Sequence, residues 1–259
     1  MRPDAGGPLA CHVSLFCLAL ARTARHNGVN RLEVQSDMAR ANVVQQLGTK
    51  GVDIPAVAGQ VIANPKSIPE LVEALQIEKG TARYAYEKVL RLVSERRPEL
   101  IYPYFDVFAA MLDSDNSFLK WGAIMTVAHL TAVDAENRFD TLFEKYYAPV
   151  TGPVMITAAN IIGSSARIAL AKPGLTERIV REILKVEKAK YKRHGRPSPE
   201  CRNVAIGHAI DSLDQFFDQI EDKAAVIRFV KRQLTNPRKP VVKKAERFLR
   251  KHGTIWKNR

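Results

Sequence analysis

Residues 112–130 read LDSDNSFLKWGAIMTVAHL, a short polar turn followed by a helix with a small residue in its first half. Related helices recur along the last three quarters of the chain, and each carries a small residue at the matching place. These residues are Ala85, Gly122, Ala158, Ala205 and Ala245, at spacings of 37, 36, 47 and 40 residues. A period of this size predicts a helical solenoid, because stacked helix pairs must share one continuous core.

The turns between the helices predict five helix pairs. We expect them at 67–78 with 81–93, 100–112 with 118–131, 139–147 with 154–171, 175–190 with 199–220, and 223–234 with 240–252. Ser67 and Glu70 match a capping box at the start of the first helix. Residues 191–198 interrupt the fourth pair and explain its longer spacing, since insertions in solenoids form loops on one face.

The chain outside these pairs divides into three further segments. Residues 1–37 are expected to be a spacer or signal-like segment outside the fold, with Met38 favoured as the biological start over cleavage of a secretory signal. Residues 38–66 contain several Gly and Pro residues and are expected to form a loose N-terminal cap. Residues 253–259 are expected to be a basic tail.

The turn and helix at 112–130 resemble the second half of a HEAT repeat, in which a polar turn precedes a basic residue and then a small residue. Lys120 with Gly122 follows this order, as do Arg83 with Ala85 and Lys243 with Ala245, whereas Ile156 and Asn203 depart from it. The resemblance covers residues 67–252. It implies an all-α fold, a right-handed α-α superhelix of about five HEAT-like helix pairs of the armadillo type. Proteins with such repeats are mostly non-catalytic scaffolds, and the fold by itself does not fix a function.

Composition limits the classes of function. The chain has 259 residues, is 46% hydrophobic and has a net charge of +13, and residues 175–259 hold 22 bases against 10 acids. No apolar run reaches the roughly 18 residues that a membrane-spanning helix needs. Cys11, Cys17 and Cys201 form neither a metal-ligand spacing nor an even disulfide set. We therefore expect a cytoplasmic protein that does not act in a membrane.

Second helices of HEAT-like units usually line the concave side, where partners dock. The residues expected there are Asn160, Ser164, Arg167, Asp211, Asp214, Arg247 and Lys251. One hypothesis is a groove for a protein or peptide partner. The other is that Asn160 and Ser164 satisfy local backbone groups, with Arg167 either exposed or paired with Asp211 or Asp214. Trp121 and Phe118 are expected in the core rather than as partner anchors.

The basic C-terminal third supports an alternative function, a solenoid that binds nucleic acid. Its candidate residues are Lys188, Lys190, Lys192, Arg193 and Arg196. Together with Tyr191 and His194 they could grip phosphates and stack a base. The competing interpretation is an exposed, mobile loop.

Catalytic and metal sites find little support. His208, Asp211, Asp214 and Asp218 recur along one helix, and His208, Asp211 and Asp218 or Asp222 share a stripe that could bind a divalent cation. The basic fifth pair beside it favours ion pairing, so we expect no metal and no cofactor. The sequence has no G-x-S-x-G, Walker or H-E-x-x-H motif. No His is followed by Glu, and neither Trp has an Asp within four residues. A DNA-repair enzyme of the HEAT-like type is therefore the least favoured alternative, and we expect no enzymatic activity.

Overall fold

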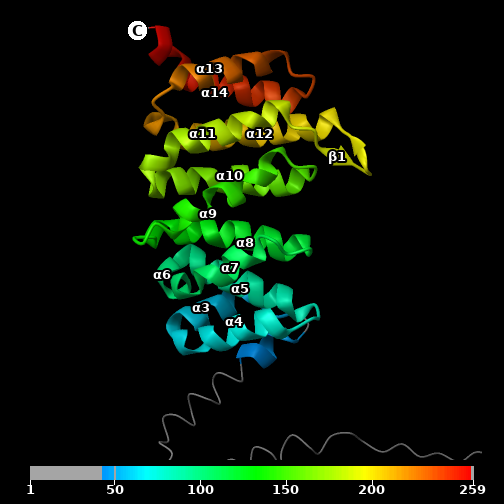
Figure 1. The fold of residues 1–259 in the computed structure, drawn as a ribbon, viewed down its shortest axis with the longest axis vertical. Coiled ribbons are helices and arrows are strands. Elements are labelled where there is room, and N and C mark those ends of the chain that lie inside the picture. The colour runs from blue at the N-terminus through cyan, green and yellow to red at the C-terminus, as the bar shows by residue number, and fades with distance from the viewer. Residues whose placement is uncertain (1–42, 50, 258–259) are drawn as a thin grey trace, which may run out of the picture.

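The computed structural model describes residues 43–49 and 51–257, with side chains up to His252. Helices dominate this part of the chain and are stacked into an elongated column, from the N-terminal helices at one end to the C-terminal helices at the other (Figure 1). The segment 1–37, expected to be a spacer or signal, lies outside the described residues.

Besides a helical stretch at residues 43–47, the α-helices are α3 (Ile54–Ala63), α4 (Ile68–Ile77), α5 (Ala82–Arg96), α6 (Pro98–Ile101), α7 (Phe105–Met111), α8 (Ser117–Leu130), α9 (Arg138–Tyr147), α10 (Met155–Ala171), α11 (Thr176–Leu184), α12 (Pro199–Phe216), α13 (Lys223–Arg232) and α14 (Lys239–Lys257). Two short strands, β1 (Lys192–Arg193) and β2 (Arg196–Pro197), form an antiparallel hairpin between α11 and α12.

The second helix of each pair stacks on the second helix of the next pair. In this inner row α3 packs against α5, α5 against α8, α8 against α10, α10 against α12, and α12 against α14. The first helices pack against their own partners, as α4 does on α5 and α13 on α14. The expected all-α solenoid of HEAT-like helix pairs is confirmed.

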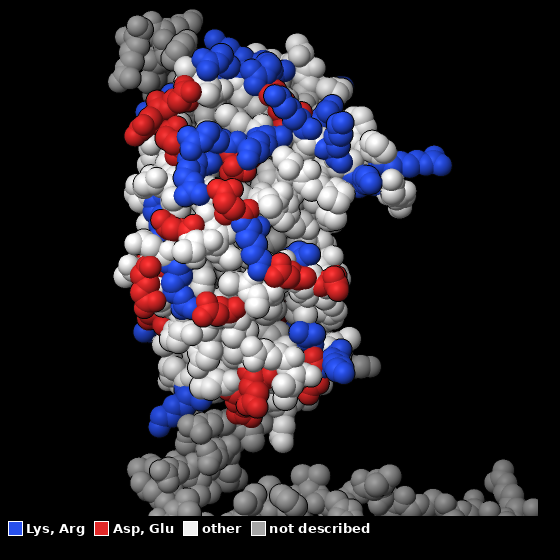
Figure 2. Space-filling view, in the orientation of Figure 1, with Lys and Arg blue, Asp and Glu red and all other residues white. Residues whose placement is uncertain are grey.

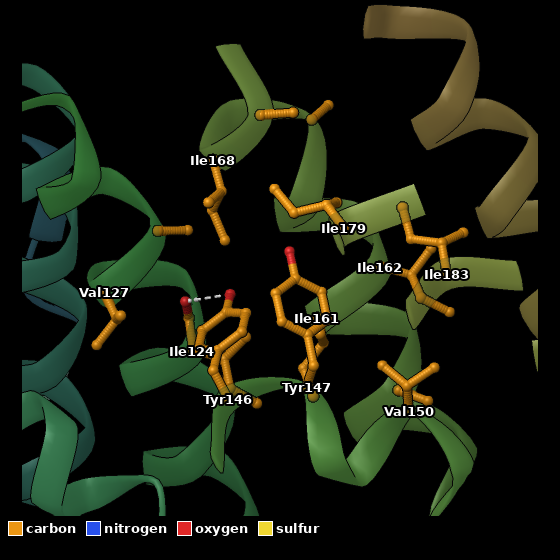
Figure 3. Packing of buried hydrophobic residues seen from close by; sticks show 14 of the residues in the cluster. Ile124, Val127, Tyr146, Tyr147, Val150, Ile161, Ile162, Ile168, Ile179 and Ile183 are labelled. Atoms are coloured by element: carbon orange, nitrogen blue, oxygen red, sulfur yellow. Dashed lines mark hydrogen bonds between the residues drawn. The ribbon is translucent and has the colours of Figure 1, made fainter. Parts of the chain in front are cut away.

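Two tyrosines of α9, Tyr146 and Tyr147, are buried in the core at the middle of the stack (Figure 3). The Tyr146 hydroxyl donates to the Ile124 carbonyl at 3.0 Å, and the Tyr147 hydroxyl lies 3.1 Å from Ser165 Oγ. Burial raises the pKa of each phenol well above its ordinary value. Both rings therefore pack as uncharged core residues whose polar ends have partners.

Asp134 ties two consecutive units together. Its buried carboxylate accepts from the Tyr102 hydroxyl at 2.7 Å and from the Phe139 amide at 3.0 Å, and Lys172 Nζ lies 3.0 Å away. Burial on its own would raise the pKa of Asp134, but these hydrogen bonds hold that pKa below its ordinary value. The charged carboxylate is thus fully partnered, as a buried ion must be.

Regular structure begins earlier than the sequence predicted. Residues 38–66 were expected to be a loose cap, yet α3 is a regular helix that packs on α5. Asp53 starts it by accepting from the Ala56 amide at 3.1 Å, and Pro55 lies in the first turn, where its missing N–H is harmless. Gly59 is tolerated inside the helix. The inner row therefore has one more member than the predicted pairs supply.

Three local predictions were wrong. Ser67 makes no capping hydrogen bond: residues Pro65–Ser67 already form a helical turn, and the hydroxyl donates to the Asn64 carbonyl at 3.1 Å. The helix expected at 100–112 is divided into α6 and α7 by a short 3₁₀ turn around Pro103, which lacks an amide hydrogen. α14 passes through Gly253 and ends at Lys257, so most of the expected basic tail is helical.

Candidate functional site

The inner row carries a groove between α8, α10 and α12. Its volume is 830 Å³, and its polar lining comes from His129, Asn160, Ser164, Arg167, His208 and Gln215. Met125 and Leu170 add apolar surface. This inner groove spans three consecutive units, and three of the seven sequence-predicted partner residues lie in it.

Arg167 is the most exposed of those three residues. Its side chain is 48% exposed, and Nη2 lies 3.9 Å from Glu95 Oε1, beyond hydrogen-bond distance. Of the two placements expected for Arg167, exposure on the inner face is the one observed. Pairing with Asp211 or Asp214 is not, because bases of α14 occupy those carboxylates.

The other four predicted partner residues join α12 to α14. Asp211 pairs with Lys244 and, at 3.0 Å, with Arg247 Nη2. Asp214 pairs with Lys251 Nζ at 2.9 Å and with His252 Nε2 at 2.6 Å. Burial would raise the pKa of Asp214, but its hydrogen bonds to Lys251 and His252 lower that pKa below its ordinary value. These residues satisfy one another across neighbouring units and do not line the inner groove.

Asn160 and Ser164 are half-buried in the groove wall, whereas Arg167 is exposed. The Asn160 side-chain amide donates to the Ile156 carbonyl at 2.9 Å, which is the local backbone contact considered as the alternative to partner binding. Ser164 is half-buried at the groove wall. The amide oxygen of Asn160 and the Ser164 hydroxyl are the polar atoms these two side chains offer to a ligand.

Two histidines complete the polar lining and were missed as groove residues by the sequence analysis. His129 Nδ1 lies 2.9 Å from the buried Ser94 hydroxyl, and burial together with nearby Arg167 and Arg91 lowers its pKa to about 4. Burial and Lys244 also lower the pKa of His208, although Asp211 opposes them. At neutral pH both rings are uncharged. Arg167 is then the one charged side chain among the described lining residues.

An aromatic ledge (Tyr84, Phe118 and Trp121) adjoins the groove. Phe118, Trp121 and Met125 are spaced i, i+3 and i+7, so they share one face of α8. The Phe118 ring lies 5.7 Å from that of Tyr84 and 5.4 Å from that of Trp121. Trp121 is half-buried and donates to Thr157 Oγ1 at 3.0 Å, whereas Phe118 is 66% exposed. The expectation of a core position was therefore wrong for Phe118. The i, i+3, i+7 spacing is the sequence signal that could have placed Phe118 on the same face as Met125.

The segment expected to be a mobile loop is a pinned hairpin. We define the basic hairpin as residues 188–198. The Tyr191 hydroxyl donates to the Val150 carbonyl at 2.6 Å and the Lys192 amide to the Pro153 carbonyl at 2.8 Å. His194 and Gly195 turn the chain with φ of 50° and 75°. Tyr191 is fully buried, so it anchors the hairpin and is not free to stack on a base.

Charge on the hairpin is exposed. Lys188, Lys190, Lys192, Arg193 and Arg196 are all exposed, and within the described part of the chain none of them forms an ion pair. The neighbouring acids are engaged elsewhere: Glu187 binds Arg232, and Glu200 binds Arg238.

Among the residues the structure describes, no group of three or more His, Cys, Asp or Glu side chains is arranged to hold a metal ion. Asp211, from the stripe considered as a cation site, and nearby Asp214 contact bases of α14. Over the same residues, no helix combines the length and hydropathy of a membrane-spanning segment.

No protein-family model matches the sequence, and no curated protein sequence matches it either. Among solved structures, the chain is similar to the designed armadillo repeat protein YIII(Dq.V1)4CPAF in complex with peptide (KR)4. The identity is 15%, the alignment covers 86% of this chain and 95% of that chain, and the TM-score is 0.46. A second designed armadillo repeat protein, YIII(Dq)4CqI, gives 14% identity, coverage of 86% and 95%, and a TM-score of 0.44. The armadillo/HEAT-type architecture of the chain is evident from its own stacked helices.

Proposed function

We propose that the protein is a non-catalytic scaffold that binds an extended peptide segment of a partner protein in the inner groove. The observation that carries the proposal is Arg167, a half-exposed guanidinium in a groove whose other polar side chains are neutral. An exposed guanidinium fork binds a carboxylate with two parallel hydrogen bonds. The partner segment would therefore present an Asp or Glu to Arg167.

The aromatic ledge supplies a second point of recognition. Phe118 exposes a large apolar surface beside the groove, and aromatic residues are common anchors in protein interfaces. The distance along α8 from Phe118 to Met125 is seven residues, about 10 Å of helix. A peptide with an apolar residue for the ledge and an acidic residue for Arg167 would use both features.

The test is a selection of displayed random 12-residue peptides on the whole chain, followed by affinity measurement with the selected peptides. We expect sequences that combine an acidic residue with an aromatic or aliphatic one. Arg167→Ala should weaken their binding by about tenfold or more, since a hydrogen bond to a charged group is worth about 1.5–3 kcal/mol. Arg167→Lys should restore only part of the loss, because it keeps the charge without the fork.

Arg181→Ala is the matched control, since Arg181 is an exposed arginine of α11 outside the groove. It should leave peptide affinity unchanged. The melting temperature of the Arg167→Ala variant should stay at the wild-type value, because Arg167 is half exposed and its nearest carboxylate is 3.9 Å away. A lower melting temperature with unchanged peptide affinity would assign Arg167 a structural role and reject the groove.

A further inference from the structure

Ion pairs within the stack neutralise part of the positive charge in the last third of the chain. Ion pairs join Lys185 to Glu182, Arg232 to Glu187, Arg238 to Glu200, Lys244 and Arg247 to Asp211, and Lys251 to Asp214. The exposed cations of the basic hairpin lack such partners among the described residues, as do Arg228 and Lys231 of α13. The hairpin therefore places five exposed cations within residues 188–196 of one projecting element.

The hairpin projects from the side of the column, beside the start of α12 (Figure 1), and the space-filling view shows Lys and Arg along this arm (Figure 2). Three hydrogen bonds fix its base: Tyr191 Oη to Val150 O, Lys192 N to Pro153 O, and Ser198 N to Tyr191 O at 2.8 Å. A pinned arm loses little conformational freedom when it binds, so its charges are held ready for a ligand.

The register of the hairpin distributes its charges over two faces. Arg193 pairs with Arg196 across the strands, so these two side chains share one face. Lys192 precedes Arg193 in the strand and therefore points to the opposite face, and Lys190, two residues earlier in extended chain, lies on the side of Lys192. A flat polyanion would contact one of these faces. A ligand with phosphates on both sides of the arm would contact both.

We propose that the basic hairpin is a DNA-binding arm that enters the major groove of a double helix, with its two charged faces toward opposite phosphate strands. The major groove of B-form DNA is about 12 Å wide and admits a two-stranded β-ribbon. The deep, narrow major groove of double-stranded RNA does not. The contacts are to phosphates, so the arm binds without strong sequence preference. This surface is separate from the inner groove, and the inference goes beyond the proposed peptide scaffold.

The probe is a fluorescent DNA duplex of mixed sequence, roughly two helical turns long, with binding followed by anisotropy. Each phosphate neutralised contributes about −0.9 to the slope of log affinity against log salt concentration. Four arm cations predict a slope of about −3.5, so the affinity should fall on the order of 100-fold between about 50 and 200 mM salt. A wild-type slope near zero would overturn the proposal without any variant.

Variants of each face test the groove geometry. Arg193→Ser with Arg196→Ser should make the slope shallower by about 2, and Lys190→Ser with Lys192→Ser should do the same. Arg228→Ser with Lys231→Ser is the charge-matched control on α13, where both residues are exposed. The control should leave the slope unchanged. If it reduces the slope as much as the hairpin pairs do, binding follows net charge and the arm has no special role.

Binding of other polyanions, measured in the same way, tests whether the arm prefers a DNA duplex. Single-stranded DNA of the same sequence and double-stranded RNA should bind at least about tenfold more weakly than the DNA duplex, since neither offers a wide major groove. Equal affinity for either would reject groove insertion. Displacement of the duplex by polyglutamate, or tighter binding to phosphatidylserine vesicles than to DNA, would identify an acidic protein or a membrane surface as the ligand and overturn the proposal.

Discussion

Glu87 is enclosed between α5 and α8 at the point where Gly122 has no side chain. A Cβ atom at position 122 would lie 1.9 Å from Glu87 Oε1, so the small residue that marks the second helices leaves room for a carboxyl group here. Burial raises the pKa of Glu87 from its ordinary 4.5 to about 7, although Arg91, 3.1 Å away, opposes the shift. Folding therefore favours the protonated form of this residue.

This shift predicts a pH dependence of stability. Between about pH 4.5 and about pH 7 the unfolded chain has released the Glu87 proton while the folded chain still holds it. The free energy of unfolding should therefore fall as the pH rises through this window. Glu87→Gln, which is neutral throughout, should lack that contribution and should be more stable than the wild type above pH 7. Urea unfolding at several pH values measures the difference.

Glu73→Gln on the exposed face of α4 is the control and should follow the wild-type profile. If the stability of Glu87→Gln also followed the wild-type pH profile, the Glu87 carboxyl group would not be protonated in the folded protein.

At the scale of single residues, the sequence predicted which residues lie on the inner face better than it predicted which side chains they contact. The inner-face position of Arg167 follows from its spacing after Asn160 and Ser164, but that spacing left both exposure and ion pairing open. The pairing of Asp211 and Asp214 with α14 was considered for the acidic stripe, but the same residues were also assigned to the partner surface. Which side chains meet across units depends on the rotation of each helix about its axis, and a spacing of 40 residues does not specify that rotation. The unusual environment of Glu87 depends on the same information.

α10 is the element with neighbours on most sides, and two of its small residues have opposite surroundings. Ala158 is fully buried, while a Cβ atom at Gly163 would have no neighbouring atom within 4 Å. Small residues thus serve close packing at one position and leave open space at the other.

The contrast predicts opposite effects on stability within one helix. Ala158→Leu should overpack the inner row and destabilise the fold by about 1–3 kcal/mol. Gly163→Ala should stabilise it by up to about 1 kcal/mol, because alanine favours the helical backbone more than glycine does. Thermal unfolding of both variants checks the prediction. Equal midpoints for the two would mean that the register of α10 is wrong.

At the scale of elements, the sequence predicted most helices because their ends carry local signals. Asn116 caps α8, accepting from the Phe118 and Leu119 amides, and Ser198 caps α12. α3 was missed because Gly and Pro were counted as breakers, although Pro55 suits a first turn. The hairpin was missed because its strands have two residues each, too short for an alternating pattern, and the contacts that pin it come from a segment about 40 residues away.

The whole column is joined by polar contacts between successive units as well as by its core. Arg178 pairs with Glu144 at 2.9 Å, Arg232 with Glu187 at 2.7 Å, and the Asp211 and Asp214 pairs attach α14 to α12. Figure 2 shows acidic and basic side chains interspersed over the body of the column. Each exposed pair contributes little, about 0.2–1 kcal/mol, but in a repeat protein such contributions add between nearest neighbours.

Removal of the contacts at one junction should therefore loosen one end of the column only. Asp211→Asn with Asp214→Asn should accelerate hydrogen exchange in α13 and α14 by about tenfold and leave α8 unchanged, because opening at the last junction does not require opening elsewhere. Asp218→Asn with Glu221→Gln removes the same charge from exposed positions nearby and should have no such effect. Equal acceleration along the whole chain would show that the column unfolds as one unit.

The bond from the Trp121 indole to Thr157 joins two successive second helices, and its consequence is optical. Any bending of the column at this joint must move the indole relative to the hydroxyl group and change the polarity around the ring. Indole emission responds to that polarity. With Trp256 replaced by Phe, the fluorescence emission of Trp121 would report how far α8 and α10 move apart. The wavelength of that emission would then measure the stiffness of the solenoid at its centre.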